Sequence, residues 1–391
     1  MTSRADSSLK TESVLAASVA MTSFRLATHD QLSPAAPGKV LILGGAFVDK
    51  TLSLRRLPPV GGDSYAQELF TGVGGCALNV AHILRQLELP HSLKVPLGIG
   101  PNTAIIEAQL KADGYDDASF IKPYRPTDST VQDCGYCLCL LDAQRERTFI
   151  VVPGLENNIK AQWLESVDFA SCDLIYLSGF DLTEDNGMVY LQEIAARKRP
   201  DCAVYFDAGA RVDFITAEAR ALLFSLNPIL HLNQLELELL TGTKDLTQGV
   251  ALLTTKTQSP VVVTLADQGC LLAQRLGRVA HGAARRTKGA LPAFGQASSN
   301  DQEQALKPSY KNIFHQAMAQ APAHGFVLKH YPTKAVPVVD ATGAGDAHSA
   351  GMIAALVQGQ TIDEGIIYGS KLAAKAVGQL GARLTLNAAI P

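Results

Sequence analysis

Short apolar runs alternate with segments of helical spacing along most of the chain. Largely apolar runs of strand length stand at 40–44, 174–178, 203–207 and 261–264. Segments with apolar residues at helical spacing stand at 79–87, 216–224 and 234–240. Short apolar strands separated by helices are typical of a parallel sheet that is covered on both faces. The pattern therefore predicts an α/β protein with three α/β/α layers and a mostly parallel central sheet.

Two stretches depart from this alternation. Residues 51–71 and 136–152 alternate or turn in the manner of antiparallel strands, and residues 142–147 have the composition of a polar hairpin tip. We expect a small β-sheet lid that projects from the main domain, with its strands within 51–72 and 121–152.

Two further regions fit neither pattern. Residues 1–38 are rich in Ser, Thr and Ala and lack the basic start of a signal peptide, which predicts a disordered leader. Residues 275–330 are poorly periodic and too long for a structureless loop, so we expect an insertion within one domain at 39–391, with one helix at 310–320. Its basic excess also suits an anion-binding surface, but a solvated excursion is the simpler interpretation.

Composition and charge narrow the class of partner. Hydrophobic residues make up 47% of the chain and charged residues 18%, which supports a sizeable core and excludes a disordered chain. The net charge of −3 favours neither nucleic acid nor an anionic membrane as a partner. No apolar run approaches the roughly 18 residues that a membrane span requires. We therefore expect a small-molecule partner, with no nucleic acid and no membrane.

Cysteine usage bears on the cellular location. The seven cysteines are an odd number scattered through apolar segments, which is typical of reduced thiols in a cytoplasmic protein. Cys134 and Cys137 match a CxxC pattern, but no second CxxC or histidine pair accompanies them. We interpret both as buried strand cysteines and predict a cytoplasmic protein.

Candidate chemistry concentrates near the C-terminus, where a predicted strand leads into Gly343-Ala344-Gly345 and a helix of small residues follows. A glycine turn at a helix start leaves backbone N–H groups unpaired, and the helix dipole adds positive charge there. This turn is therefore a candidate anion hole for a phosphate. Asp346, in the first turn of the helix, could accept a proton from a hydroxyl that attacks phosphorus. The alternative is that Asp346 only complements the helix dipole.

Three segments strengthen the catalytic interpretation. They are Gly72-Val-Gly-Gly-Cys-Ala-Leu-Asn79, Asn233-Gln-Leu-Glu-Leu-Glu-Leu-Leu-Thr-Gly242 and Asp340-Ala-Thr-Gly-Ala-Gly-Asp346. In kind and order they resemble the signatures of the ribokinase-like, or phosphofructokinase-B (PfkB), carbohydrate kinases. The similarity covers about residues 39–390 apart from the insertion and looks closest to an uncharacterised bacterial sugar-kinase branch. It implies ATP-dependent phosphorylation of a hydroxyl on a sugar or sugar-like molecule, with ATP and Mg²⁺ as cofactors.

The resemblance also implies roles for single positions. Asp346 matches the general base, and Gly343, Ala344 and Gly345 match the anion hole. The positions that match sugar contacts are Asp49, Gly74, Gly75, Asn79 and Arg211. Two of these have structural alternatives, because Asn79 could cap a helix and Arg211 could form a salt bridge.

Further positions match nucleotide and cation contacts. Those implied for the nucleotide and its Mg²⁺ are Asn233, Glu236, Thr264, Gly269 and Ser370. Those implied for a K⁺ ion are Asp340, Thr342, Ala376, Gln379, Gly381 and Thr385. The chain also departs from the family, with Ala266, Ser370 and His348 where many relatives have Gly, Asn and Phe. These departures bear on the choice of nucleotide and leave the transfer residues in place.

Other functions remain open. A nucleoside kinase would use an apolar base pocket, which Phe70, Tyr65 and Tyr136 of the lid could supply. A catalytically silent sugar-binding regulator is a rival of another class, and the intact Asp346 turn argues against it. The first strand lacks the G-x-G-x-x-G of a dinucleotide oxidoreductase. Pairing of two chains through the lid is an option that the sequence leaves open.

Overall fold

The computed structural model describes residues 38–122, 132–144, 146–275, 321 and 325–386. All of these belong to one compact unit, residues 35–391. The predicted leader and most of the predicted insertion, including its helix at 310–320, lie outside the described residues. Within the described residues, no helix combines the length and apolarity that crossing a membrane requires.

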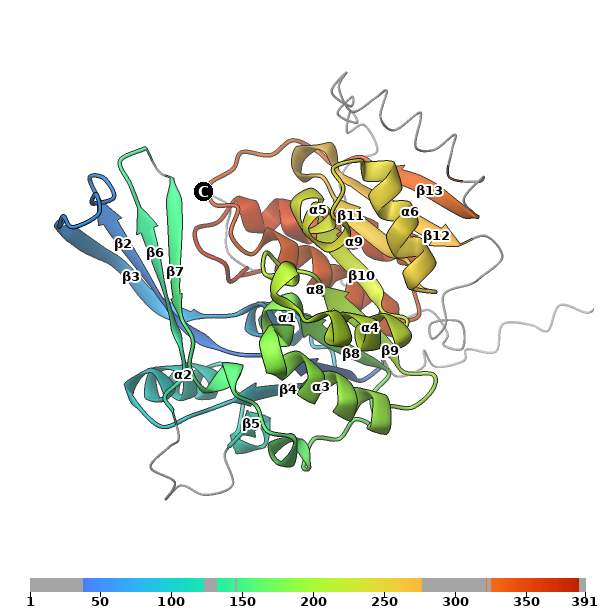
Figure 1. The fold of residues 1–391 in the computed structure, drawn as a ribbon, viewed down its shortest axis with the longest axis horizontal. Coiled ribbons are helices and arrows are strands. Elements are labelled where there is room, and N and C mark those ends of the chain that lie inside the picture. The colour runs from blue at the N-terminus through green and yellow to red at the C-terminus, as the bar shows by residue number, and fades with distance from the viewer. Residues whose placement is uncertain (1–37, 123–131, 145, 276–320, 322–324, 387–391) are drawn as a thin grey trace, which may run out of the picture. The chain divides into compact units, whose positions relative to one another are not determined.

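A nine-stranded sheet forms the centre of the unit, in the order β13-β12-β11-β10-β9-β8-β1-β4-β5 (Figure 1). The parallel strands are β1 (Val40–Leu43), β4 (His91–Pro96), β5 (Phe120–Ile121), β8 (Leu174–Ser178), β9 (Ala203–Asp207), β10 (Ile229–Asn233) and β11 (Val261–Thr264). Two antiparallel strands complete one edge, β12 (Cys270–Arg275) and β13 (Phe326–Tyr331). The strands predicted at 40–44, 174–178, 203–207 and 261–264 are confirmed.

Helices cover both faces of this sheet. One face packs against α1 (Cys76–Gln86), α2 (Pro101–Ala112), α8 (Ala344–Val357) and α9 (Ile362–Val377). The other packs against α3 (Glu184–Arg197), α4 (Ala217–Ser225), α5 (Gln234–Thr241) and α6 (Leu246–Lys256). Alternate residues of β1 supply the two layers, since Val40 and Ile42 pack into the first core and Leu41 and Leu43 into the second. The predicted three-layer α/β/α class is confirmed.

A separate four-stranded sheet forms the lid, in the order β3-β2-β6-β7 (Figure 1). Its strands are β2 (Phe47–Leu54), β3 (Ala66–Gly74), β6 (Tyr136–Leu141) and β7 (Arg147–Val152). The first lid strand therefore begins before residue 51, and the second lid strand ends beyond residue 72. The predicted bounds were too narrow because the inner ends of β2 and β3 lie against the main domain, where burial obscures the alternation of a half-exposed strand.

The predicted insertion also needs a correction. Its expected range, 275–330, includes most of β13, which pairs with the whole length of β12 from Cys270 to Arg275. The central sheet thus continues on the far side of the insertion. β13 contains polar residues such as Lys329 and His330, so a prediction based on apolar runs does not identify it as a strand.

Candidate active site

A cavity of about 360 Å³, here called the lid cavity, opens at the carboxyl ends of the central strands. Ser178 and Asp207 reach it as the last residues of β8 and β9, and Cys137 and Val151 reach it from the lid. The carboxyl ends of parallel strands are the usual place for a ligand in this class of fold. The predicted sugar contacts and the anion turn meet here. Those lining the cavity are Asp49, Gly75, Asn79, Arg211, Gly343, Gly345 and Asp346.

Asp49 lies on β2, in register with Gly72 of the neighbouring strand. Its carboxylate lies over the backbone of Gly74, where a Cβ atom would stand only 1.8 Å from Asp49 Oδ2. Gly75 adopts a φ of +124°, and a Cβ atom there would lie 2.5 Å from the carbonyl oxygen of Gly45. Both glycines are thus required by close approach. Burial raises the pKa of Asp49 to about 6.

Asn79 and Asp346 are 267 residues apart in sequence and form a hydrogen bond, in which Asn79 Nδ2 donates to Asp346 Oδ2 at 2.7 Å. The other side-chain atom of Asn79, Oδ1, is buried and has no hydrogen-bond partner among the described residues. Such a buried acceptor is costly unless a ligand completes it. The N-cap of α1 is Gly75, with no side-chain cap, so Asn79 does not have the alternative role of helix cap.

Asp346 is buried, and burial raises its pKa to about 6. The negative charge of Asp207 adds to this increase, while hydrogen bonds with Asn79 and Cys76 oppose it. A carboxylate with a pKa near neutrality is well matched to general-base catalysis. It is largely ionised at neutral pH, and it is basic enough to take a proton from the substrate.

The turn before Asp346 is shaped by its glycines. Gly343 is the N-cap of α8 with a φ of +77°, and a Cβ atom there would lie 2.2 Å from the carbonyl oxygen of Ala382. At Gly345 a Cβ atom would meet nothing within 4 Å, because the residue faces open space. The N–H groups at a helix start lack intrahelical acceptors. Here the Ala344 N–H donates to the carbonyl oxygen of Ala341 at 3.3 Å, and Gly343 and Gly345 line the lid cavity.

A second cavity of about 530 Å³, here called the α9 cavity, lies on the other side of this turn. Gly345 lines both cavities. The predicted nucleotide contacts collect in the second one. Those lining it are Asn233, Thr264, Gly269 and Ser370. The described residues thus form two cavities that share one wall, the anion turn.

The backbone near Thr264 keeps its shape despite one departure from the family. Ala266 adopts a φ of +50°, which glycine takes more readily, so the turn survives the replacement. At Gly269 the φ is +85° and a Cβ atom would lie 2.0 Å from the carbonyl oxygen of Tyr331. Glycine is required at that position.

Asn233 and Glu236 form a capping box at the start of α5. Asn233 Oδ1 accepts from the Glu236 N–H at 2.9 Å, and Glu236 Oε2 accepts from the Asn233 N–H at 2.8 Å. Asn233 lines the α9 cavity and Glu236 the lid cavity. From sequence alone Glu236 would be an exposed helix residue, but it is buried, and burial followed by the charge of Asp207 raises its pKa to about 7.

Arg211 lines the lid cavity, with its guanidinium carbon 6.0 Å from the centre of the Phe180 ring. No ion pair joins Arg211 to another described residue, so the salt-bridge alternative has no support in that part of the chain. The guanidinium is therefore available to a ligand of the cavity.

The residues predicted to bind K⁺ lie together, but another cation is already present. Arg147 of the lid donates through one guanidinium nitrogen to Asp340 Oδ1 at 2.8 Å and to Thr342 Oγ1. The arrangement does not fit the K⁺ prediction, because these are two of the oxygen-bearing side chains assigned to the ion.

The sequence did not predict a site role for His231. His231 is buried within the apolar strand β10, with Nδ1 3.0 Å from Asp207 Oδ1 and Nε2 3.1 Å from His348 Nδ1. His348 Nε2 in turn lies 3.4 Å from Ser370 Oγ. This hydrogen-bonded chain connects the lid cavity, at Asp207, with the α9 cavity, at His348 and Ser370. A histidine inside an apolar strand was the available signal.

Comparisons with known proteins agree with this geometry. The sequence pattern described as pfkB family carbohydrate kinase matches residues 40–288 and 317–389. A protein of Escherichia coli (strain K12), described as uncharacterized sugar kinase YegV, is 26% identical over 346 residues, which are 88% of this chain and 89% of the relative.

Solved structures share the fold. A ribokinase of Thermotoga maritima is 19% identical with a TM-score of 0.63, and the match covers 89% of this chain and 95% of that one. A nucleoside kinase of Methanocaldococcus jannaschii is 15% identical with a TM-score of 0.60, and the match covers 89% and 94%. At these identities the likeness concerns the fold alone.

Proposed function

Since the chain belongs to the pfkB family of carbohydrate kinases, we propose that it transfers the γ-phosphate of ATP to a hydroxyl group of an unphosphorylated sugar or sugar-like alcohol. The observation that carries the proposal is the shared wall of the two cavities. A sugar in the lid cavity and a triphosphate in the α9 cavity would meet at Gly345, beside the carboxylate of Asp346. The name of the Escherichia coli relative, a sugar kinase, supports the same class of acceptor.

In this proposal the sugar is bound by Asp49 and Asn79. The Asp49 carboxylate accepts hydrogen bonds from hydroxyl groups, and the unpaired Oδ1 of Asn79 accepts another. Asp346 removes the proton of the attacking sugar hydroxyl. The hydroxyl oxygen bonds to the γ-phosphorus, and the bond between the γ-phosphorus and the bridging β-phosphate oxygen breaks, which releases ADP. The N–H groups of Gly343 and Gly345 stabilise the charge that develops on the transferred group, whereas the Ala344 N–H already has a backbone partner.

Asn233 and Glu236 fit a role at the Mg²⁺ ion. Asn233 lines the α9 cavity and Glu236 the lid cavity, so the pair stands beside the junction where the phosphates would lie, and oxygen is the ligand that Mg²⁺ prefers. Glu236 is a buried carboxylate whose pKa is raised by burial, so a nearby divalent cation would stabilise its ionised form. When bound with the nucleotide, Mg²⁺ supplies positive charge that neutralises the phosphate oxygens.

The acceptor class can be tested with an ADP-release assay across sugars, polyols, nucleosides and phosphosugars. We expect turnover with one or a few unphosphorylated sugars in the presence of MgATP, and the Asp346→Asn protein serves as the blank. Turnover of phosphosugars only would show that the acceptor class is wrong. A thermal-shift screen of the same compounds, with and without an ATP analogue, would identify binding independently of turnover.

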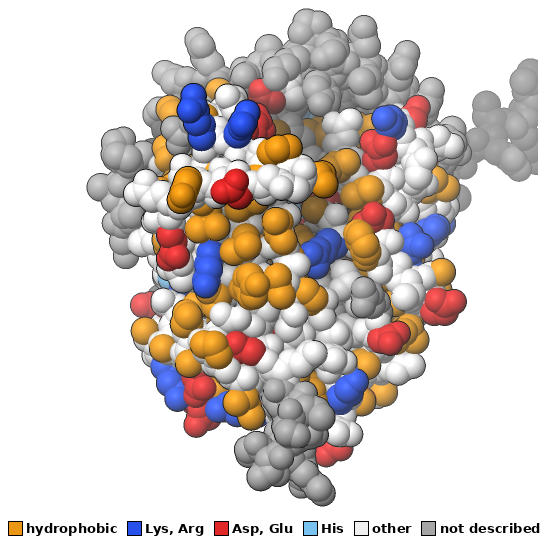
Figure 2. Space-filling model, turned by 60° about the vertical axis from the view of Figure 1, so that its left-hand side comes forward, with side chains coloured by type: hydrophobic (Ala, Val, Ile, Leu, Met, Phe, Trp, Pro, Cys, Tyr) orange, Lys and Arg blue, Asp and Glu red, His pale blue; other side chains and the backbone are white. Residues whose placement is uncertain are grey.

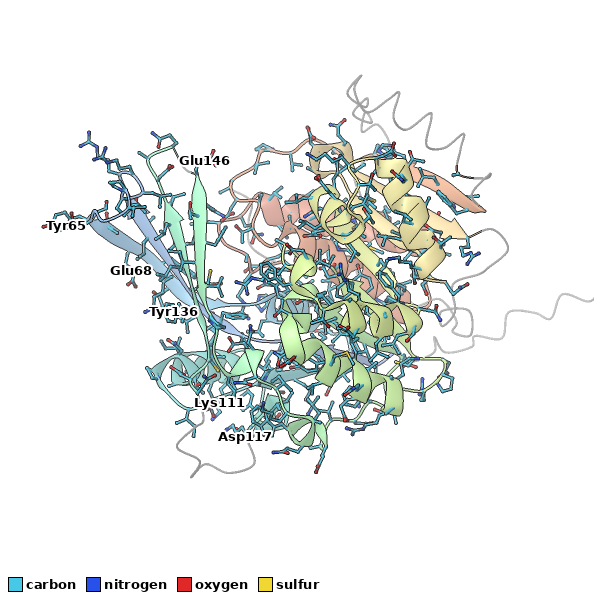
Figure 3. The ribbon with its side chains drawn as sticks, in the orientation of Figure 1. Tyr65, Glu68, Lys111, Asp117, Tyr136 and Glu146 are labelled. Carbon is cyan, nitrogen blue, oxygen red and sulfur yellow. The ribbon has the colours of Figure 1, made fainter. Side chains whose placement is uncertain are left out.

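The nucleoside-kinase alternative loses two of its three aromatic residues. Tyr65 lies at the far end of the lid, and its side chain is 96% exposed (Figure 3). Tyr136 precedes Cys137, which lines the lid cavity, so the two side chains point to opposite faces of the lid. Phe70 remains on the lid but does not line the lid cavity, whereas the rings of Phe47 and Phe180 do, so a riboside stays the alternative acceptor. The intact Asp346 turn argues against a regulator without activity.

The rate should depend on pH in the acidic range. Burial raises the pKa of Asp346 to about 6, so the carboxylate loses its capacity to accept a proton as the pH falls below that value. We expect kcat to be nearly constant at neutral pH and to fall about tenfold for each pH unit below 6. The measurement is kcat between about pH 5 and 8 at saturating substrates. A rate that stays constant down to about pH 5 would contradict an essential base with this pKa.

The lid also bears on assembly. Leu138 and Ile150 are paired neighbours on its outer face, opposite the cavity-lining Cys137 and Val151, and Ile150 is 47% exposed. Figure 2, in which the lid side comes forward, shows hydrophobic side chains gathered there. We propose that the outer faces of two lids pair in a homodimer, and light scattering of Ile150→Lys against the wild-type protein would test this.

All seven cysteines are free, which supports the proposed cytoplasmic location.

A further inference from the structure

Arg147 joins the lid to the segment that leads into the anion turn. Arg147 is the first residue of β7, at the hairpin end of the lid, and is 193 residues from its partner in sequence. It forms an ion pair with Asp340 at 2.8 Å and donates to Thr342 Oγ1 as well. The side chain of Asp340 is only 4% exposed and that of Arg147 33%, so the carboxylate is buried while the guanidinium is partly open to solvent.

Asp340 connects three segments. Its Oδ1 accepts from the N–H of Thr342 at 2.9 Å and from Arg147, and its Oδ2 accepts from the N–H of Gly381 at 3.0 Å. Burial alone would raise the pKa of this carboxyl, but hydrogen bonds from Arg147 and Thr342 outweigh it and hold the pKa well below its usual range. The carboxylate is therefore ionised, and Arg147 is the cation that balances it.

The remaining positions predicted for K⁺ also have protein partners. The carbonyl oxygen of Ala376 accepts from the Gln379 N–H at 3.0 Å. The Gln379 side chain closes the loop onto Thr385, accepting from its N–H at 3.0 Å and donating to its carbonyl oxygen at 2.9 Å. The loop around Asp340 is thus held by protein donors, and a second cation beside the guanidinium would be repelled by it.

We propose that Arg147 is a positioning residue that takes the place of a monovalent cation at Asp340, so that closure of the lid itself orders the Gly343–Gly345 turn. The inference rests on the proposed kinase function. Arg147 contacts Thr342, which is adjacent to Gly343. Thr342 and Gly343 both line the lid cavity. A dissolved ion would order the turn whether or not the lid is closed. A guanidinium carried by the lid orders the turn only when the lid covers the cavity. ATP hydrolysis by water in the open cavity is thereby reduced.

A melting comparison tests the inference without turnover. The full chain and its Arg147→Ala variant are melted in potassium, sodium and choline chloride at equal ionic strength. We expect the wild-type midpoint to be the same in all three salts. The variant should melt lower in choline and recover part of the loss in potassium, because the vacated carboxylate then accepts the ion. Stabilisation of the wild-type protein by potassium, or a variant that does not respond to it, would overturn the proposal.

Kinetics supply the second measurement. The wild-type kcat should be equal in the three salts, whereas Arg147→Ala should lose at least about tenfold in choline and regain activity with potassium or added guanidinium. Arg147→Lys keeps a positive charge on the lid and should stay independent of potassium, which a merely structural role would not predict. Arg56→Ala, at an exposed arginine of the β2–β3 connection, is the matched control and should keep wild-type activity.

The two proposals fail in different ways. If the wild-type protein turns over no sugar or riboside in any salt, the kinase function is contradicted and the melting comparison still decides the role of Arg147. If turnover is present but Arg147→Ala retains the wild-type rate in choline, the positioning role is excluded and the function stands. If Arg147→Ala does not fold, Arg147→Lys decides, because potassium dependence in that variant would overturn the inference.

Discussion

Asparagine in place of Asp346 should remove turnover while leaving folding and ligand binding in place. The substitution is nearly isosteric, and its carbonyl oxygen can still accept the hydrogen bond from Asn79 Nδ2. It cannot accept the proton of the attacking hydroxyl. Loss of a general base costs about 10²–10⁴ in rate, or roughly 3–5 kcal/mol of transition-state stabilisation. The measurement is kcat beside calorimetric affinities for the sugar and a non-hydrolysable ATP analogue.

A matched control is available in the same cavity. Asp181 is also a buried carboxyl whose pKa burial raises to about 6, and its oxygens accept from the Gly45 N–H and from Ser178 Oγ. Because both oxygens already have protein partners, Asp181→Asn should affect stability far more than the chemical step. If Asp346→Asn keeps more than about a tenth of the wild-type kcat, Asp346 is not the base. If binding and stability are lost together with kcat, its role is structural.

A methyl group at Gly345 should block the reaction without disturbing the fold. Because a Cβ atom there meets nothing within 4 Å, Gly345→Ala introduces no clash with the protein. The methyl group would instead project into the wall shared by the two cavities, where the proposed mechanism places the transferred phosphoryl group. A displacement of about 1 Å at the reacting centre typically costs about 10²-fold in rate, and we expect at least that loss in kcat.

Gly365→Ala is the control for this prediction. Gly365 lies inside α9, where a Cβ atom would make ordinary contacts of 3.4 to 3.6 Å, so alanine should be tolerated. The melting temperatures of both variants and their affinities for each substrate alone complete the comparison. A Gly345→Ala protein with near wild-type kcat would show that phosphate transfer does not take place along this wall.

The fold was predictable from the sequence because its central strands are short, apolar and regularly spaced. Runs such as 203–207 are buried on both faces, so their composition alone identifies them. The same logic fails at β13, where Lys329 and His330 occupy a strand at the sheet edge. Edge strands need no apolar alternation, and pairing with β12 specifies β13 instead.

The site was predictable where its residues follow one another in a motif. Asn233 and Glu236 form a local capping box, and the glycines before Asp346 stand at a helix start, so short-range rules apply to them. Arg147 is different. Its partner is 193 residues away, and no local pattern specifies which arginine of the lid meets Asp340. Contacts of this kind depend on how two sheets approach each other, which a linear pattern does not encode.

The buried carboxyls of the lid cavity also bear on how the protein should be stored. Asp49, Asp181 and Asp346 each have a pKa of about 6, above the usual value of an unfolded aspartate, so folding favours their protonated forms. That stability is fully present below about pH 4 and is lost as the pH rises through 6, and for Asp346 it is on the order of 3 kcal/mol. These three carboxyls therefore favour the folded, unliganded protein more at mildly acidic pH than at neutral pH, while burial lowers the pKa of His82, His91 and His348 and acts in the opposite direction. At neutral pH, the hydroxyl groups of a bound sugar would donate hydrogen bonds to the ionised carboxylates and so stabilise the folded protein.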